Sequence, residues 1–129
     1  MLFQKAMDNE KLESGQNIHA LGLGYTYNYL GREGYTIYEV NTDSNHHFQI
    51  LAKRDNELII VAVRTAYHPN IGAIDKAIQE QLINESDRLN AIPHFAGLAV
   101  TPLKTNNLEI DGFTRGKEYE VTFNGITIV

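Results

Sequence analysis

The apolar run Leu58-Ile59-Ile60-Val61-Ala62-Val63 constrains the fold of this chain more than any other feature. It is rich in β-branched residues and is followed by Arg64 and Thr65, a pattern typical of a buried strand. Side chains two residues apart in a strand lie on the same face of the sheet. We therefore expect Ala62 and Arg64 to share one face.

A second strand is predicted directly before this run, over residues 47–53. Alternation along it places Phe48 and Gln49 on opposite faces of the sheet. Asp55-Asn56 is predicted to form a tight turn into the strand at 58–65. The two strands are therefore expected to pair as a hairpin, with Gln49, Ala62 and Arg64 lining one shared depression.

The remaining elements are predicted from changes of hydrophobic period along the chain. The expected order is a helix over 16–31, strands at 35–40, 47–53 and 58–65, a helix over 71–90, a strand at 95–100, and a hairpin within 118–129 that turns at Asn124-Gly125. Helices and strands mixed in this order predict an α/β (α+β) fold with a mixed central sheet flanked by helices.

The 129 residues are expected to form a single domain. Within it, residues 1–14 are predicted to be an N-terminal arm, residues 15–102 the core, and residues 103–129 a β-rich tail. No apolar run approaches the length of a membrane span, and the first ten residues become acidic before a signal peptide could form. A cytoplasmic location without a membrane partner is therefore expected.

Charge and cysteine content narrow the classes of function. Eleven basic residues against sixteen acidic ones give a net charge of −5. Binding to nucleic acid depends on Lys and Arg contacts with phosphates, so this charge does not favour a nucleic-acid partner. An acidic nuclease can still gather positive charge in a cleft or use metal ions. The chain has no cysteine, which excludes disulfides, thiolate metal ligands and a thiol nucleophile.

Several short motifs resemble the PD-(D/E)XK nuclease superfamily, and most of all its small endonuclease-like proteins related to Holliday-junction resolvases. The resemblance covers roughly residues 18–100 and implies a restriction-endonuclease-like core. The motifs that carry it are Tyr29-Leu30, Gly34-Tyr35-Thr36-Ile37, Asn41, Ile50-Leu51-Ala52 and Ile60-Val61-Ala62-Val63-Arg64-Thr65.

The resemblance implies that the aspartate of the superfamily falls on Gln49, the glutamate on Ala62 and the lysine on Arg64. The glutamate sometimes found on the first helix falls on Leu23. Mg²⁺ is held mainly by carboxylates, and arginine stays protonated, so it cannot act as a base. These departures predict a degenerate active site with no catalytic residue, no metal ligand and no cofactor. Arg64 keeps the ability to hold a phosphate or a carboxylate.

Two acidic residues leave a metal-dependent alternative open. In this superfamily an acid can migrate from the strand to the neighbouring helix, so Glu39, Gln49, Asp75 and Arg64 are the components of a rearranged Mg²⁺ site. The alternative explanations are structural. Asp75 near the start of a helix is favoured by the helix dipole, and Arg64 can simply form an ion pair with Glu39 or Asp75.

Two other patterns have structural explanations that we favour. His46-His47 suggests a metal site, but adjacent strand residues point to opposite faces, so a structural or surface role is expected. Gly22 and Gly24 lie within a helical pattern and lack the third glycine of a dinucleotide-binding motif. We expect them to allow close approach of another element.

Tyr25 and Tyr29 share one face of the first helix, which is consistent either with an interface or with the edge of the core. Taken together, the sequence favours a catalytically inactive nuclease-type protein that acts by binding a protein partner or by forming a homo-oligomer. The alternatives are a metal-dependent DNA endonuclease with rearranged ligands, and a nucleic-acid-binding module that uses Arg64.

Overall fold

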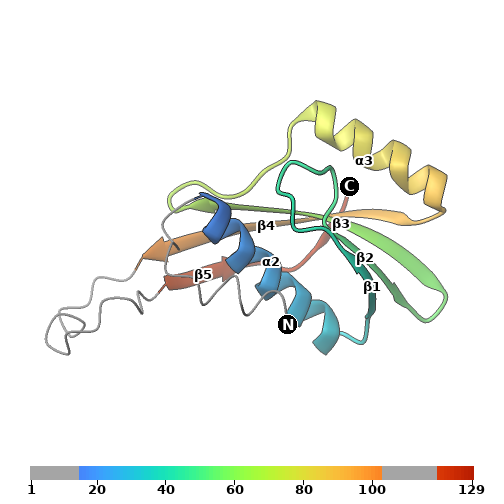
Figure 1. Ribbon diagram of the computed structural model, residues 1–129, viewed down its shortest axis with the longest axis horizontal. Helices are drawn as coiled ribbons and strands as arrows, with labels where there is room; N and C mark the ends of the chain where they lie inside the picture. Colours follow the sequence, from blue (N-terminus) through green and yellow to red (C-terminus); the bar gives the residue numbers. More distant parts are fainter. Residues whose placement is uncertain (1–14, 103–118) are drawn as a thin grey trace, which may run out of the picture.

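The computed structural model describes residues 15–102 and 119–129. The elements in chain order are α2 (Gly15–Arg32), β1 (Thr36–Val40), β2 (Ile50–Arg54), β3 (Glu57–Tyr67), α3 (Lys76–Leu89), β4 (Ile92–Pro102), β5 (Tyr119–Phe123) and β6 (Thr127–Ile128). The described strands form one sheet in the order β1-β2-β3-β4-β5, with β6 also pairing with β4. The pairing of β3 with β4 is parallel and the others are antiparallel. The prediction of an α/β fold with a mixed sheet between helices is confirmed (Figure 1).

Strand β3 lies at the centre of the sheet, which explains its apolar composition. It pairs with β2 on one side, where Ile50 lies opposite Val61, and with β4 on the other side, where Val63 lies opposite Ala96. All five residues 59–63 are fully buried. A strand that is covered on both faces has to be apolar on both faces, so the uninterrupted run marks the middle of the sheet.

The two helices cover opposite faces of the sheet, and each forms a core of its own (Figure 1). The core under α2 is the larger one and consists of Leu23, Leu30, Ile50, Ala52, Ile59, Val61, Val63, Ala96 and Leu98. The second core, under α3, consists of Phe48, Ile60, Ala62 and Leu82. Helix α3 packs mainly against β3 and β4, so it covers only part of its face of the sheet.

The second helix begins later than the pattern over 71–90 predicted. Lys76 is its first residue, and Oδ1 of Asp75 accepts a hydrogen bond from the backbone N–H of Ile78 at 2.8 Å. A carboxylate in this position satisfies a backbone donor that has no partner within the helix. Asn90 ends the helix in the left-handed conformation. Asp75 therefore sets the start of α3, and the apolar residues before it belong to a loop.

The segment before β2 also differs from the prediction, because the strand begins at Ile50 and not at residue 47. The backbone bends at His46 and His47, before the strand starts, and Nδ1 of His46 lies 2.7 Å from the carbonyl oxygen of Phe48. Strict alternation does not apply in a bend, so Phe48 and Gln49 line the same groove. The prediction that they lie on opposite faces is wrong.

The predicted hairpin at Asn124-Gly125 is not formed. Strands β5 and β6 both pair with β4 and not with each other: Phe123 lies opposite Leu98 and Thr127 lies opposite Phe95. The eleven-residue β4 is long enough to accept both segments along one edge, so the chain continues past Gly125 in the same direction. Residues 103–118 of the predicted tail lie outside the described residues. None of the helices in the described ranges is long and apolar enough to cross a membrane.

Candidate functional site

The side chains of Gln49 and Arg64 meet directly. Oε1 of Gln49 accepts hydrogen bonds from Nη1 of Arg64 at 2.9 Å and from the backbone N–H of Val63 at 2.7 Å. Nε2 of Gln49 donates to the carbonyl oxygens of Asp43 at 3.1 Å and His46 at 2.7 Å. Gln49 is 1% exposed. Its amide is therefore fully engaged and ties the loop before β2 to β3.

The guanidinium of Arg64 is held by neutral acceptors. Besides Gln49, it donates to the carbonyl oxygens of Val63 at 3.0 Å and His46 at 3.2 Å. Burial lowers the pKa of Arg64, and the negative charge of Asp75 opposes this effect. Within the described ranges no carboxylate lies close enough to Arg64 for an ion pair, so the expected pairing with Glu39 or Asp75 is not formed.

Apolar packing closes the position at which the sequence resemblance expects a glutamate. Ala62 is fully buried between Phe48, Ile60 and Leu82 on the α3 side of the sheet. Leu23, at which the resemblance expects the helical glutamate, is fully buried in the core on the opposite side. Neither side chain carries a polar atom, so neither position contributes a ligand.

The two acids of the rearranged-site alternative do not converge. Asp75 uses its carboxylate to cap α3, whereas Glu39 lies on β1 and lines a groove with Gln49. In the part of the chain that the structure describes, no group of three or more His, Asp or Glu side chains is placed to hold a metal ion.

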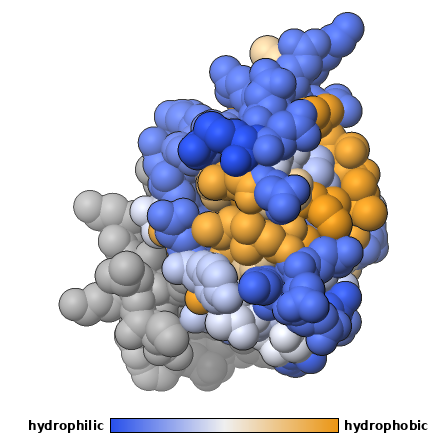
Figure 2. Space-filling model, turned by 90° about the vertical axis from the view of Figure 1, so that its right-hand side faces the viewer, coloured by the Kyte–Doolittle hydropathy of each residue, from blue (hydrophilic) through white to orange (hydrophobic). Residues whose placement is uncertain are grey.

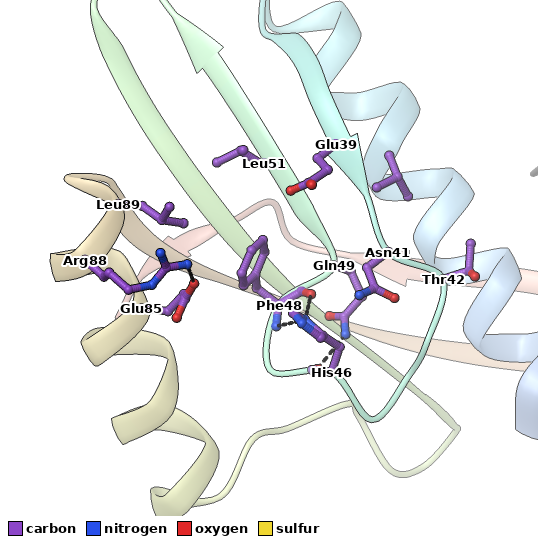
Figure 3. Close-up of a pocket in the computed structure, with 11 residues that line it drawn as sticks. Glu39, Asn41, Thr42, His46, Phe48, Gln49, Leu51, Glu85, Arg88 and Leu89 are labelled. Carbon is purple, nitrogen blue, oxygen red and sulfur yellow. Dashed lines mark hydrogen bonds and ion pairs between the residues drawn. The ribbon is translucent and has the colours of Figure 1, made fainter.

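The groove lies between α3 and the β1–β2 side of the sheet and has a volume of about 540 Å³ (Figure 3). We call it the α3 groove. It is lined by Phe48, Leu51, Leu89 and Val40, and by the polar residues Glu39, Asn41, Thr42, His46, Gln49, Glu85 and Arg88. Of the three positions expected to share a depression, Gln49 lines the groove, whereas Ala62 is buried beneath Phe48 and Arg64 lies behind Gln49.

The histidine pair lies beside the α3 groove and does not split between two faces. The rings of His46 and His47 stack with their centroids 4.4 Å apart, because both residues precede the strand. Nε2 of His47 is 3.8 Å from Oε1 of Glu85, whose other oxygen bonds Arg88. Burial lowers the pKa of His47, and the neighbouring His46 adds to this effect. The expectation that the two rings point in opposite directions is wrong.

The sequence analysis did not identify His19 as a buried histidine whose charge interacts with that of Arg64. It is 5% exposed on α2, and its Nε2 has no hydrogen-bond partner among the described residues. Burial is the main cause that lowers the pKa of His19, and the positive charge of Arg64 lowers it further. Gly22, one turn later, allows α2 to approach Thr65 closely, as expected for a packing glycine. His19 and Gly22 are three residues apart and therefore lie on one side of the helix, so the sequence could have indicated that His19 faces the same packed element as Gly22.

Comparison with known proteins places the chain in a family. The family model described as "Domain of unknown function (DUF8840)" matches residues 16–129. No curated protein matches the chain. Among solved structures, the chain is similar to Hjc, a Holliday junction resolvase from the archaeal hyperthermophile Archaeoglobus fulgidus. The identity is 16%, the match covers 64% of this chain and 69% of that chain, and the TM-score is 0.42.

Proposed function

The chain belongs to the DUF8840 family, and we propose that this member is a nuclease-type protein that binds a partner and does not cleave nucleic acid. The observation that carries the proposal is the hydrogen bond between Gln49 and Arg64. At the two positions where the sequence resemblance expects a metal-binding carboxylate and a lysine, the side chains instead form a hydrogen bond with each other.

The chemistry of these residues opposes metal-dependent hydrolysis. A catalytic Mg²⁺ needs carboxylates, and its role is to acidify water and to stabilise the leaving group. The amide oxygen of Gln49 already accepts two hydrogen bonds, one of them from a cationic guanidinium. A metal ion at Gln49 would face the positive charge of Arg64, and Ala62 offers no donor atom.

The same contacts give Arg64 a structural role. Arg64 and Gln49 both bond the carbonyl oxygen of His46, and Gln49 also bonds that of Asp43. They therefore fix the loop that forms one wall of the α3 groove. A pair of side chains at the old catalytic positions thus shapes a binding surface.

The α3 groove is the surface through which binding is proposed. It combines an apolar floor with polar walls, the composition of ordinary ligand and peptide sites. Its charged side chains are Glu39, Glu85 and Arg88, and the whole chain carries a net charge of −5. Phosphate groups are not attracted by such a surface, so a protein partner is favoured over nucleic acid.

A cleavage assay tests the absence of activity. Purified protein is incubated with duplex, branched and single-stranded DNA in the presence of Mg²⁺ or Mn²⁺, beside the double variant Arg64→Ala/Asp75→Ala. We expect no cleavage above the level of the variant, which controls for contaminating nucleases. Cleavage that is present in the parent and lost in the variant would overturn the proposal and favour the rearranged metal site.

Metal binding gives an independent measurement. The electron paramagnetic resonance signal of free Mn²⁺ decreases when the ion binds to protein, and this readout is insensitive to trace nuclease. We expect the signal to be unchanged by stoichiometric protein. A decrease that disappears in Asp75→Ala or Glu39→Ala would contradict the structural interpretation of these acids.

A further inference from the structure

The Asn124-Gly125 pair, which does not form the predicted hairpin turn, lies in the short connection between β5 and β6. Both strands pair with the same edge of β4, so the chain passes along that edge without reversing its direction (Figure 1). The side chain of Asn124 is exposed, and among the described residues its amide has no hydrogen-bond partner. The carboxamide of Asn124 is therefore free to rotate against the backbone.

The backbone nitrogen that follows this side chain is also unengaged. Within residues 15–102 and 119–129, the N–H of Gly125 donates no hydrogen bond, although it lies beside a paired strand. Glycine has no Cβ, so nothing on this residue obstructs the approach of its nitrogen to a neighbouring group. An asparagine carboxamide and the next backbone nitrogen can close a five-membered ring, and neither group is held by another contact at this position.

We propose that Asn124 is a site of spontaneous deamidation. The N–H of Gly125 gives its proton to solvent and the nitrogen attacks Cγ of Asn124, whose side-chain nitrogen leaves as ammonia, so that a cyclic imide remains. Water then opens the imide. Cleavage between the ring nitrogen and Cγ gives aspartate, whereas cleavage between the ring nitrogen and the main-chain carbonyl carbon gives isoaspartate. The net reaction consumes water and releases ammonia, and it is independent of the binding proposed for the α3 groove.

Asn90 shows how a different structural setting opposes the same reaction. It is exposed at the end of α3, on the side of the molecule where Figure 2 shows polar side chains bordering an apolar area. The next residue, Ala91, is also small, but its backbone N–H donates to the carbonyl oxygen of Ser86 at 2.8 Å. A nitrogen held in this bond has to be released before it can attack, so the end of the helix protects Asn90.

Isoaspartate adds a carbon atom to the backbone between two anchored strands, because the chain then continues through the former side chain. Phe123 of β5 and Thr127 of β6 are both paired with β4, so the connection is fixed at each end. Ile126 packs against the larger core, and Val129 packs against the second core. The longer backbone displaces these contacts, so the isoaspartate form is expected to be less stable. Ordinary aspartate only adds a negative charge at an exposed position.

Incubation of the full chain at mildly alkaline pH tests the proposal, with peptide mapping by mass spectrometry as the readout. The same chain unfolded in urea gives the rate at which the Asn-Gly pair reacts without structure. We expect Asn124 to be converted into a mixture of aspartate and isoaspartate at comparable rates in the folded and the unfolded chain. An Asn124 that stays intact in the folded protein and reacts in urea would overturn the proposal, because the fold would then protect it.

Ala91→Gly is the matched control, because it places the same dipeptide where the attacking nitrogen is hydrogen-bonded. We expect Asn90 in this variant to react at least about tenfold more slowly in the folded protein than in urea, since the end of the helix has to open first. Circular dichroism verifies that the variant is folded. If Asn90 and Asn124 react equally fast in the folded variant, hydrogen bonding of the nitrogen does not select the site, and the proposal is wrong.

Urea unfolding of aged protein tests the consequence for β6. We expect the midpoint of the aged parent to fall, whereas Asn124→Gln should keep its midpoint on ageing, because its longer side chain cannot close a five-membered ring. Asn124→Asp carries the added charge without the added carbon atom, so it should unfold at the midpoint of the fresh parent. An aged parent that contains isoaspartate and is as stable as the fresh protein would contradict the expected displacement of β6.

Discussion

Oε1 of Gln49 lies 2.9 Å from Nη1 of Arg64, and this contact joins the loop before β2 to the far half of β3. The amide accepts from a cation and also donates to two backbone carbonyls, a combination that a carboxylate could not provide. The pair is therefore specific for glutamine. It satisfies buried polar groups that would otherwise destabilise the fold.

Replacing Gln49 with alanine is expected to lower the free energy of unfolding by about 2–3 kcal/mol, because the backbone N–H of Val63, the guanidinium of Arg64 and two backbone carbonyl groups each lose one hydrogen bond. Urea denaturation followed by circular dichroism measures the change. Gln79→Ala, at an exposed position of α3, is the control and should shift stability by less than about 0.5 kcal/mol. Equal effects of the two substitutions would show that the network contributes nothing.

Substituting Arg64 with lysine, the residue that the resemblance expects, should destabilise the protein by about 1–2 kcal/mol. A single ammonium group cannot reproduce the planar geometry with which the guanidinium reaches Gln49, Val63 and His46. Thermal and urea unfolding of Arg64→Lys provide the measurement. If the variant is as stable as the parent, the claim that Arg64 fixes the groove wall is wrong.

Gly22→Ala is expected to destabilise the protein by about 1–3 kcal/mol, because the added Cβ would overlap Oγ1 of Thr65. Gly31→Ala, in the same helix, meets no neighbouring atom and should stabilise by about 0.5–1 kcal/mol through helix propensity. The double variant Gly22→Ala/Thr65→Ala should recover part of the loss. Without that recovery, the close approach of α2 and β3 is not the cause.

The stability is expected to fall as the pH decreases below about 6.5, the ordinary histidine pKa. Burial lowers the pKa of His19, His47 and His94 in the folded protein. The unfolded chain then binds protons that the folded chain does not, so the stabilisation is complete above pH 6.5 and is lost towards the folded-state pKa values. Each histidine contributes a slope of at most about 1.4 kcal/mol per pH unit.

Urea unfolding at pH 7.5, 6.5 and 5.5 measures this dependence. His19→Asn and His94→Asn should each reduce the slope, because they remove one buried site that titrates. His68→Asn, at an exposed position, is the matched control for the replacement of an imidazole by an amide. A stability that rises on acidification would contradict the prediction.

Local patterns predicted the type and order of most elements because hydrophobic period depends on near neighbours in the chain. The apolar run marked the central strand, and α2 ends within two residues of the expected position. The predicted ends and pairings of elements are wrong where a capping side chain or a strand distant in the sequence determines them. Asp75 caps α3, so the helix starts later than predicted. Strands β5 and β6 each pair with β4, so they do not pair with each other as a hairpin.

The sequence by itself determined which chemistry is absent at the positions that the resemblance compares with a nuclease site, since a glutamine, an alanine and an arginine carry no carboxylate wherever they lie. Only the tertiary structure decided what these residues do instead. Gln49 finds Arg64 because β2 and β3 pair, His46 turns towards both because the backbone bends before β2, and the α3 groove opens because α3 leaves β1 and β2 partly uncovered. These relationships depend on the packing of separate elements, which no local pattern encodes.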